Sequence, residues 1–229
     1  MKLDRRLSAV ASLVRPGAVL ADIGTDHAYL PAYLVQAGVC PRAIAADLRK
    51  GPLQNADSTI ASCGLGDVIT TRLSDGLDSF GPNDFDDVVL AGMGGLLITE
   101  LLMRAPWLRN GAKRIIAQPM RHPWAVRQFF YENGFALVRE ICVADGSRCY
   151  CAMAAEYTGR QTPLTPALPY VGTLRPQQSE ETARFLFWQR KQLQTRRDAL
   201  LAADPDSAEG RELTTILADF DRLTKGDTP

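Results

Sequence analysis

Short apolar runs that alternate with helical segments restrict the fold of this chain more than any other feature of its sequence. The runs that are typical of strands span 18–24, 43–47, 68–72, 87–91 and 114–118. Segments with helical spacing lie between them, at 29–37, 53–62, 96–103 and 124–133. Strands that are buried on both faces are continuously apolar, and repeated strand–helix units predict a parallel sheet covered by helices on both sides.

Two further strands are expected at 135–145 and 148–157, on either side of Asp145-Gly146. Asp-Gly between apolar runs is a strong signal for a β-hairpin. An antiparallel hairpin at the end of a parallel sheet is the arrangement of class I methyltransferases. The expected fold class is therefore α/β, with a Rossmann-like doubly wound sheet, although this pattern alone does not separate a methyltransferase from a dehydrogenase.

The sequence changes in character after the expected hairpin. Residues 158–175 are rich in Pro and Gly and are expected to form a connector, and helices are expected at 179–203 and 206–224. Leucines recur every seven residues in the first of these helices, at Leu186, Leu193 and Leu200. This spacing predicts an antiparallel coiled-coil hairpin that projects from the sheet, and a helical cap packed on the sheet is the alternative. The expected domains are 1–157 and 176–229.

Composition limits the class of protein. Apolar residues make up 46% of the chain, which excludes a wholly disordered protein. No apolar run approaches the roughly 18 residues of a membrane helix, and the N-terminal segment lacks an apolar signal core. We therefore expect a cytoplasmic protein. The five cysteines show no CxxC spacing, so we expect buried free thiols, with no structural zinc and no disulfide framework.

The charges balance overall but are unevenly distributed. The chain has 26 basic and 26 acidic residues, so its net charge does not indicate a strongly basic nucleic-acid binder. Residues 66–100 nevertheless carry seven acids and one base, whereas residues 101–131 carry six bases and no acid. The basic stretch is either a solvated surface or a patch that contacts phosphates.

The turn after the first expected strand is the most informative about chemistry. In doubly wound sheets the ligand lies over the carboxyl ends of the strands, beside the first strand. Gly24 permits a tight turn there, but the loop carries Asp26 and Ala28 in place of further glycines. A carboxylate repels a pyrophosphate and attracts a cofactor with an ammonium and a sulfonium, such as S-adenosylmethionine. An acid that only caps the next helix is the alternative reading of Asp26.

Acids and glycines also follow the next strands. Asp47 is placed to accept hydrogen bonds from ribose hydroxyls, a role common to NAD and S-adenosylmethionine sites. Asp75, before Gly76, can accept from an adenine amino group or belong to a plain turn. The glycines of 92–95 either let the backbone approach a ligand or form a tight strand–helix turn.

Polar side chains follow the fifth expected strand. Gln118 can hydrogen-bond a base edge and Arg121 can meet a phosphate, or both are ordinary loop residues. His27 and His122 are the two histidines of the chain, and His27 either belongs to the site or only orients its loop. The sequence shows no Ser/His/Asp constellation and no metal site.

Five motifs occur in one order and spacing: DIGTDHAYLP at 22–31, GPL at 51–53, SDGL at 74–77, AGMGG at 91–95 and QP at 118–119. Together they resemble the bacterial tRNA (adenine-22 N1)-methyltransferase family (TrmK type) over nearly the whole chain. The resemblance implies a Rossmann-like domain that binds S-adenosylmethionine and a coiled-coil C-terminal domain that helps hold tRNA. The implied product is N1-methyladenosine at position 22 of tRNA.

The resemblance also implies where the cofactor binds. The residues expected at the cofactor site are Asp22, Gly24, Thr25, Asp26, His27, Tyr29, Asp47, Asp75, Gly76, Gly92, Met93 and Gly94. Asp26 and Gln118 are the candidates for catalysis. A carboxylate such as Asp26 can stabilise the positive charge that methylation adds to adenine, and Gln118 is expected to shape the base pocket together with Met93 and Gly94.

RNA contacts are expected from basic residues in three parts of the chain. The candidates are Arg5, Arg6, Arg121, Arg127, Arg190 and Arg197. The target base must be unpaired or flipped out, because N1 lies on its Watson–Crick edge. We expect a monomer with neither a membrane nor a protein partner. The alternatives are methylation of another RNA position or of a small molecule, a non-catalytic RNA-binding module, and, least favoured because of Asp26, an NAD-dependent oxidoreductase.

Overall fold

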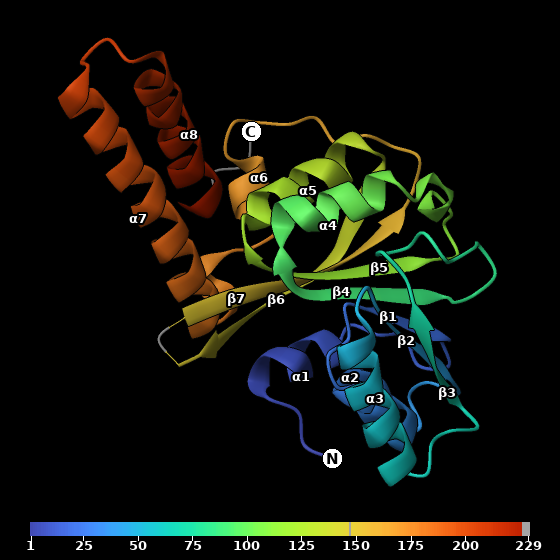
Figure 1. Ribbon diagram of the computed structural model, residues 1–229. Coiled ribbons are helices and arrows are strands. Elements are labelled where there is room, and N and C mark those ends of the chain that lie inside the picture. The colour runs from blue at the N-terminus through green and yellow to red at the C-terminus, as the bar shows by residue number, and fades with distance from the viewer. Residues whose placement is uncertain (147, 226–229) are drawn as a thin grey trace.

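A seven-stranded mixed sheet forms the centre of the computed structural model, which describes residues 1–146 and 148–225 (Figure 1). The strand order is β3-β2-β1-β4-β5-β7-β6. Strands β1 to β5 run parallel, and β7 pairs antiparallel with both β5 and β6. The strands are β1 Leu20–Ile23, β2 Ala43–Asp47, β3 Ile69–Leu73, β4 Asp87–Gly94, β5 Arg114–Arg121, β6 Phe135–Asp145 and β7 Arg148–Tyr157.

The expected strands and the expected hairpin are confirmed, with shifts of at most three residues at strand ends. The largest difference is that β4 and β5 each continue three residues further than their apolar runs. The two strands remain paired past an irregularity, where Met93 lies opposite Pro119 and Gly94 lies opposite Arg121. Because of this extension, glycines of the AGMGG motif and the residues after Gln118 lie in paired strands and not in loops.

Helices cover both faces of the sheet (Figure 1). One face is covered by α1 Arg5–Ala11, α2 Tyr29–Gln36 and α3 Lys50–Ser62. The other is covered by α4 Gly95–Met103, α5 Pro123–Glu132 and the short α6 Leu168–Val171. Short 3-10 turns lie at Pro106–Leu108 and Pro176–Gln178. Neither α1 nor α6 was predicted, and α6 lies within 158–175, the segment that is expected to form a connector.

Side chains that alternate along the strands divide the core into two layers. Ile23 and Leu90 pack in one cluster with Phe130 of α5, whereas Leu20 and Val89 pack in the other cluster with helices α1 to α3. All four strand residues are buried. This burial on both faces explains why the parallel strands are continuous apolar runs in the sequence.

The two expected C-terminal helices are confirmed as α7 Glu180–Ala203 and α8 Ala208–Lys225. Ser179 caps α7, because its side chain accepts a hydrogen bond from the Thr182 backbone N–H at 3.0 Å. The pair stands at the β6/β7 edge of the sheet, with the turn between the helices farthest from it (Figure 1). Phe185, near the start of α7, and Leu213 of α8 belong to the same hydrophobic cluster as the sheet.

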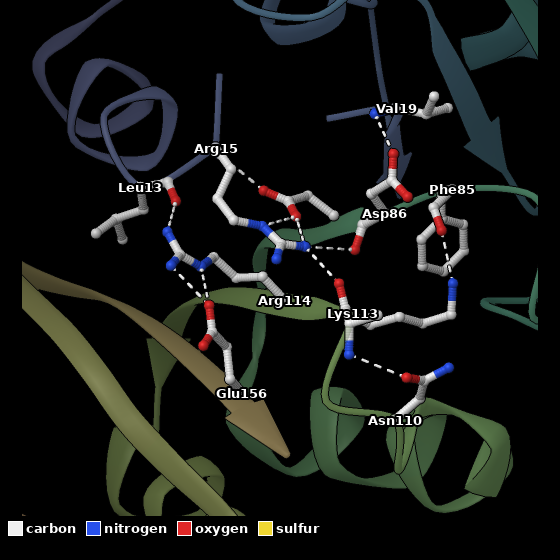
Figure 2. A network of polar contacts seen from close by, with 11 residues as sticks. Leu13, Arg15, Val19, Phe85, Asp86, Asn110, Lys113, Arg114 and Glu156 are labelled. Carbon is white, nitrogen blue, oxygen red and sulfur yellow. Dashed lines mark hydrogen bonds and ion pairs between the residues drawn. The ribbon is translucent and has the colours of Figure 1, made fainter. Parts of the chain in front are cut away.

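Charge pairs close the amino ends of the strands (Figure 2). Asp87, the first residue of β4, is fully buried and accepts hydrogen bonds from the backbone N–H and the Nε of Arg15, at 2.8 and 2.7 Å. Arg114, the first residue of β5, bonds Glu156 at 2.7 Å and the carbonyl oxygen of Leu13 at 3.1 Å. These contacts hold the segment between α1 and β1 against the sheet.

Other features of the described residues agree with an ordinary folded domain. In this part of the chain no helix is long and apolar enough to cross a membrane, and no group of three His, Cys, Asp or Glu side chains is arranged to hold a metal ion. All five cysteines are free thiols. Burial raises the pKa of Cys149 to about 11, so this thiol stays protonated and unreactive at neutral pH.

Candidate functional site

The carboxyl ends of the parallel strands bring the expected site residues to one edge of the sheet. The backbone N–H groups of Gly24 and Thr25, after β1, both donate to the carbonyl oxygen of Ala46 in β2, at 2.8 and 2.9 Å. The Ser74 N–H, after β3, donates to the carbonyl oxygen of Asp47 at 3.0 Å. The turns that follow β1, β2 and β3 therefore lie side by side, where doubly wound sheets bind their ligands.

The turn after β1 has a strained backbone and places its side chains in defined positions. Ala28 is buried with φ of +53°, a region that residues other than glycine seldom adopt, and its N–H donates to Thr25 Oγ1 at 3.1 Å. Asp26 points away from the core with 71% of its side chain exposed, and its Oδ2 lies 3.4 Å from His27 Nε2. The His27 ring in turn stacks on Tyr29.

Gly24 is required by both its conformation and its neighbour. Its φ is +80°, and an added Cβ would lie 2.5 Å from the Cε of Met93 in β4. Below this turn, Asp22 is buried in β1. Burial raises the pKa of Asp22 to about 6, against a smaller opposite effect of a hydrogen bond with Thr25. The turn after β1 therefore carries an exposed acid at 26, and the strand beneath it carries a buried acid at 22.

Asp47 and Asp75 differ in how far their carboxylates are already engaged. Asp47 is buried, and its Oδ1 accepts from the Arg49 N–H at 2.8 Å and lies 3.7 Å from Arg49 Nε, which leaves its other oxygen for a ligand. Asp75 is half-exposed and forms an ion pair with Arg104 at 3.1 Å, which also donates to the Asp75 carbonyl oxygen at 2.9 Å. Gly76 turns the chain sharply beside Leu101, with φ of +57°.

Gln118 lies beneath the surface of this edge, and this changes its expected role. Its side chain is fully buried, and its Oε1 accepts from Arg6 Nη1 at 2.8 Å and from the Gly92 N–H at 3.3 Å. Its Nε2 donates to the Pro119 carbonyl oxygen at 3.2 Å. In this structure Gln118 supports its neighbours and does not present its amide to a base.

Arg6 is the residue that covers Gln118. Asp4 caps helix α1, because its carboxylate accepts from the Leu7 N–H at 2.6 Å. The helix places Arg6 against Gln118 of β5. The Arg6 side chain is mostly buried and lies 3.7 Å from Asp4. Arg6 was expected to contact a phosphate, and in this structure its guanidinium donates to Gln118. An acid before a helical segment is a known start signal, so Asp4 was the feature of the sequence that could have revealed α1.

The residues at this edge fit S-adenosylmethionine. Asp26 offers an exposed negative charge to a cofactor with an ammonium and a sulfonium, and Asp47 offers acceptors to ribose hydroxyls. The backbone at Gly94 borders open space, because an added Cβ would meet no atom within 4 Å. The strand end at Gly94 is thus open to close approach by a ligand.

Comparisons with known proteins place the chain in a family. A methyltransferase domain family matches residues 3–153. The tRNA (adenine(22)-N(1))-methyltransferase of Bacillus subtilis is 37% identical over 156 residues, which are 68% of this chain and 66% of that protein. A Streptococcus pneumoniae protein solved in complex with S-adenosyl-L-methionine is 30% identical with a TM-score of 0.80, over 94% of this chain and all of that one. The chain belongs to the tRNA (adenine(22)-N(1))-methyltransferase family.

The crystal structure of the B. subtilis M1A22 tRNA methyltransferase TrmK extends this likeness to the C-terminal helices. It is 27% identical to this chain, with a TM-score of 0.79, and the match covers 98% of this chain and 96% of that one. The resemblance drawn from the five sequence motifs is confirmed, and the NAD-dependent oxidoreductase alternative is wrong. The family therefore agrees with the Asp26 argument, in which a carboxylate in the first turn disfavours a pyrophosphate.

The prediction that Arg127 contacts RNA is wrong. Its side chain is fully buried, its Nε donates to Glu140 Oε1 at 2.7 Å, and its Nη1 donates to the carbonyl oxygens of Pro169 and Tyr170, both at 3.2 Å. Burial alone would lower the pKa of Arg127, but the charge and hydrogen bond of Glu140 outweigh it and raise the pKa. Arg127 therefore ties α5 to β6 and α6 as part of the core.

The remaining expected RNA contacts are on the surface but differ in their partners. Arg190 joins α7 to α8 through Asp221, with two hydrogen bonds of 2.7 and 2.9 Å. Arg197 bonds the adjacent Asp198, and Arg5 bonds Glu181 at 2.9 Å. Arg121 is exposed at the end of β5 and has no acidic partner among the described residues. Among these arginines Arg121 is the one most available to a phosphate.

Proposed function

We propose that this protein transfers the methyl group of S-adenosylmethionine to N1 of adenine 22 in tRNA. The observation that carries this proposal is the exposed Asp26 carboxylate on a strained turn, at the strand edge where doubly wound sheets bind their ligands. We further propose that it works as a cytoplasmic monomer. In this proposal α7 and α8 act as a coiled-coil hairpin that helps hold the tRNA.

The chain's residues divide the work of holding the cofactor. Asp47 accepts hydrogen bonds from the ribose, while Asp75 and Gly76 border the adenine. The backbone from Gly92 to Gly94 approaches the cofactor closely because it has no bulky side chain at two of its three positions. When bound, S-adenosylmethionine supplies an electrophilic methyl group.

Asp26 acts on the substrate base. Adenine N1 carries a lone pair, so no strong base is needed to create the nucleophile, and positioning alone can contribute about 7–11 kcal/mol to the acceleration. Methylation places positive charge on the adenine ring, which the Asp26 carboxylate stabilises, and the same carboxylate can accept a proton from the exocyclic amine. The adenine must leave its base pair or stack to reach this edge.

Gln118 is a positioning residue in this mechanism. Its Oε1 holds both the Arg6 guanidinium and the Gly92 N–H, so it fixes α1 and the end of β4 relative to each other. Met93, which contacts the Gly24 turn, shapes the floor on which the base lies. Correct placement of these groups matters because small displacements lower the rate strongly.

The test is methyl transfer from labelled S-adenosylmethionine into tRNA, with the modified nucleoside identified and mapped. We expect N1-methyladenosine at position 22, and no label in a matched tRNA that carries guanine at that position. Label at another adenine would keep the reaction class and overturn the site specificity. A protein that binds the cofactor and labels no RNA would overturn the proposed function.

A further inference from the structure

A cleft of about 720 Å³ opens next to the carboxyl end of β5, between the sheet and the paired helices α7 and α8. Its wall includes Arg121, Trp124, Arg148, Tyr170, Trp188 and Arg196. Arg121 lies three residues beyond Gln118 in the same strand and opposite Gly94 of β4. The cleft therefore begins where the proposed methyl-transfer site ends, and it contains none of the expected cofactor residues.

Tryptophan rings form part of the wall on both sides. Trp188 of α7 leaves 43% of its surface exposed, and the Lys191 ammonium lies 5.0 Å from the centre of its ring. On the opposite side Trp124 stacks on Tyr170, with 5.9 Å between ring centres and 28° between ring planes. Exposed aromatic side chains that line a cleft mark binding surfaces, and tryptophan rings stack on any nucleic-acid base.

The charge of the wall is of one sign. Arg121, Arg148 and Arg196 line the cleft, and among the described residues no Asp or Glu does so. Arg196 pairs with Glu209 of α8, whereas Arg121 and Arg148 have no acidic partner in the described part of the chain. Arginines beside aromatic rings complement the phosphates and the bases of an unpaired nucleic-acid strand, whereas an acidic peptide would use only the arginines.

The turn between β5 and α5 holds one side of this cleft in place. His122 directly precedes α5 with φ of +54°, and its ring meets the Trp124 ring edge to face with 6.2 Å between ring centres. An added Cβ at Gly95 would lie 2.2 Å from the His122 carbonyl oxygen, so α4 packs directly against this turn. A strained turn held by its neighbours presents Arg121 and Trp124 in fixed positions.

We propose that this cleft binds a nucleotide adjacent to the target adenine, with its base stacked on Trp188 and its flanking phosphates on Arg121 and Arg148. The inference rests on the proposed function, and it names a second RNA site beside the first. A base that leaves its stack takes a stacking partner away from its neighbour. The Trp188 ring replaces that partner and so offsets part of the cost of exposing the adenine.

The direct test is Trp188→Ala, with Phe187→Ala as the matched control. Phe187 is the preceding residue of α7, is 59% exposed and does not line the cleft. Its ring contacts the Trp188 ring, so the control also measures the loss of that packing. Trp188→Ala is expected to weaken the binding of labelled tRNA about 10-fold and to raise KM for tRNA, with kcat and cofactor affinity unchanged. Phe187→Ala should stay within about twofold of the wild type, and Trp188→Phe should retain most of the affinity.

A second measurement addresses the phosphates. Replacing Arg121 and Arg148 together by Gln is expected to make tRNA binding less dependent on salt. The negative slope of log affinity against log salt concentration should decrease in magnitude by about 2. If Trp188→Ala bound tRNA as tightly as the wild type, the proposal that this cleft binds a nucleotide would be wrong, even if the wild type methylates adenine 22. If the wild type methylates no tRNA, the proposed function fails, and the binding comparison of Trp188→Ala with Phe187→Ala still decides the cleft.

Discussion

The two ends of the parallel sheet use the same residue types in opposite ways. At the amino ends, Asp87 is fully buried and bonded by the backbone and side chain of Arg15, and Arg114 is paired with Glu156 (Figure 2). At the carboxyl ends, Asp26 is mostly exposed and Asp47 has a single hydrogen bond to Arg49. A fully paired acid stabilises the fold, whereas an acid with free lone pairs is available to a ligand.

Backbone strain follows the same division. Among the described residues Ala28 and His122 are the non-glycine residues with positive φ, and both lie at the carboxyl ends, in the turns after β1 and β5. Strained turns persist only where the surrounding structure fixes them, and they cluster at functional sites. The fold therefore places both strained non-glycine residues at the carboxyl ends of the strands, whereas the ion pairs of Asp87 and Glu156 lie at the amino ends.

The largest expected effect comes from removing the Arg15–Asp87 ion pair at the amino ends of the strands. Arg15→Met would leave the Asp87 carboxylate buried with one remaining donor, the backbone N–H of residue 15. We expect a loss of about 4 kcal/mol in the free energy of unfolding, measured with urea, and normal methyl transfer by the folded fraction. Arg211→Met is the control, because its ion pair with Asp206 is exposed and should contribute less than about 1 kcal/mol. Similar losses in both variants would contradict the special role of Asp87.

The buried acid of the carboxyl end should act on stability in the opposite sense. The pKa of Asp22 is about 6 in the folded protein against 3.8 when unperturbed, because burial disfavours the charged form. The folded state therefore binds the Asp22 proton more tightly than the unfolded state does. The stabilisation that this proton gives to the folded protein is fully present below about pH 4 and is lost as the pH rises through 6. The shift corresponds to about 3 kcal/mol.

Asp22→Asn tests this prediction, because the amide has the same shape and does not titrate. Urea unfolding of both proteins at about pH 4 and about pH 7.5 gives the comparison. The variant should gain stability relative to the wild type at the higher pH, by about 3 kcal/mol. A stability difference that is the same at both pH values would show that Asp22 is not responsible.

The exposed acid should affect turnover and leave stability alone. Asp26→Asn removes the charge proposed to stabilise the methylated adenine, and we expect kcat to fall about 100-fold, with the free energy of unfolding changed by less than about 0.5 kcal/mol. Methyl transfer into tRNA at saturating cofactor measures the effect. Asp67→Asn, an exposed acid before β3, should behave as the wild type. Unchanged kcat with normal cofactor and tRNA binding would remove Asp26 from this role.

The sequence revealed most of the fold because burial on both faces makes a parallel strand continuously apolar. The ends of β4 and β5 were placed too early, since Gly92, Gly94 and Pro119 are typical of turns, and only the partner strand shows that pairing continues across them. Helix α1 was missed because it has seven residues, too few for a clear helical period.

The site was less predictable than the fold, because its decisive contacts join distant segments. Gln118 and Arg6 were both expected in contact with RNA, yet 112 residues apart in sequence they bond each other. Arg127 lay in a basic stretch, and its buried partner Glu140 belongs to a different strand. The residues whose positions follow from a strand end, such as Asp26 and Asp47, were placed at the expected edge, since topology alone brings them there.

The smallest expected effect is on cofactor affinity at Asp47. Asp47→Asn keeps an oxygen for the Arg49 N–H, so the turn and the stability should be preserved, but it replaces an acceptor for ribose hydroxyls by an amide donor. We expect the affinity for S-adenosylmethionine to fall about 10-fold, or about 1.4 kcal/mol, by calorimetry, with kcat unchanged at saturating cofactor. Asp57→Asn is the control, because Asp57 bonds Thr71 on the outside of α3. If Asp47→Asn weakened folding and left cofactor affinity unchanged, Asp47 would belong with Asp87 among the acids that stabilise the fold.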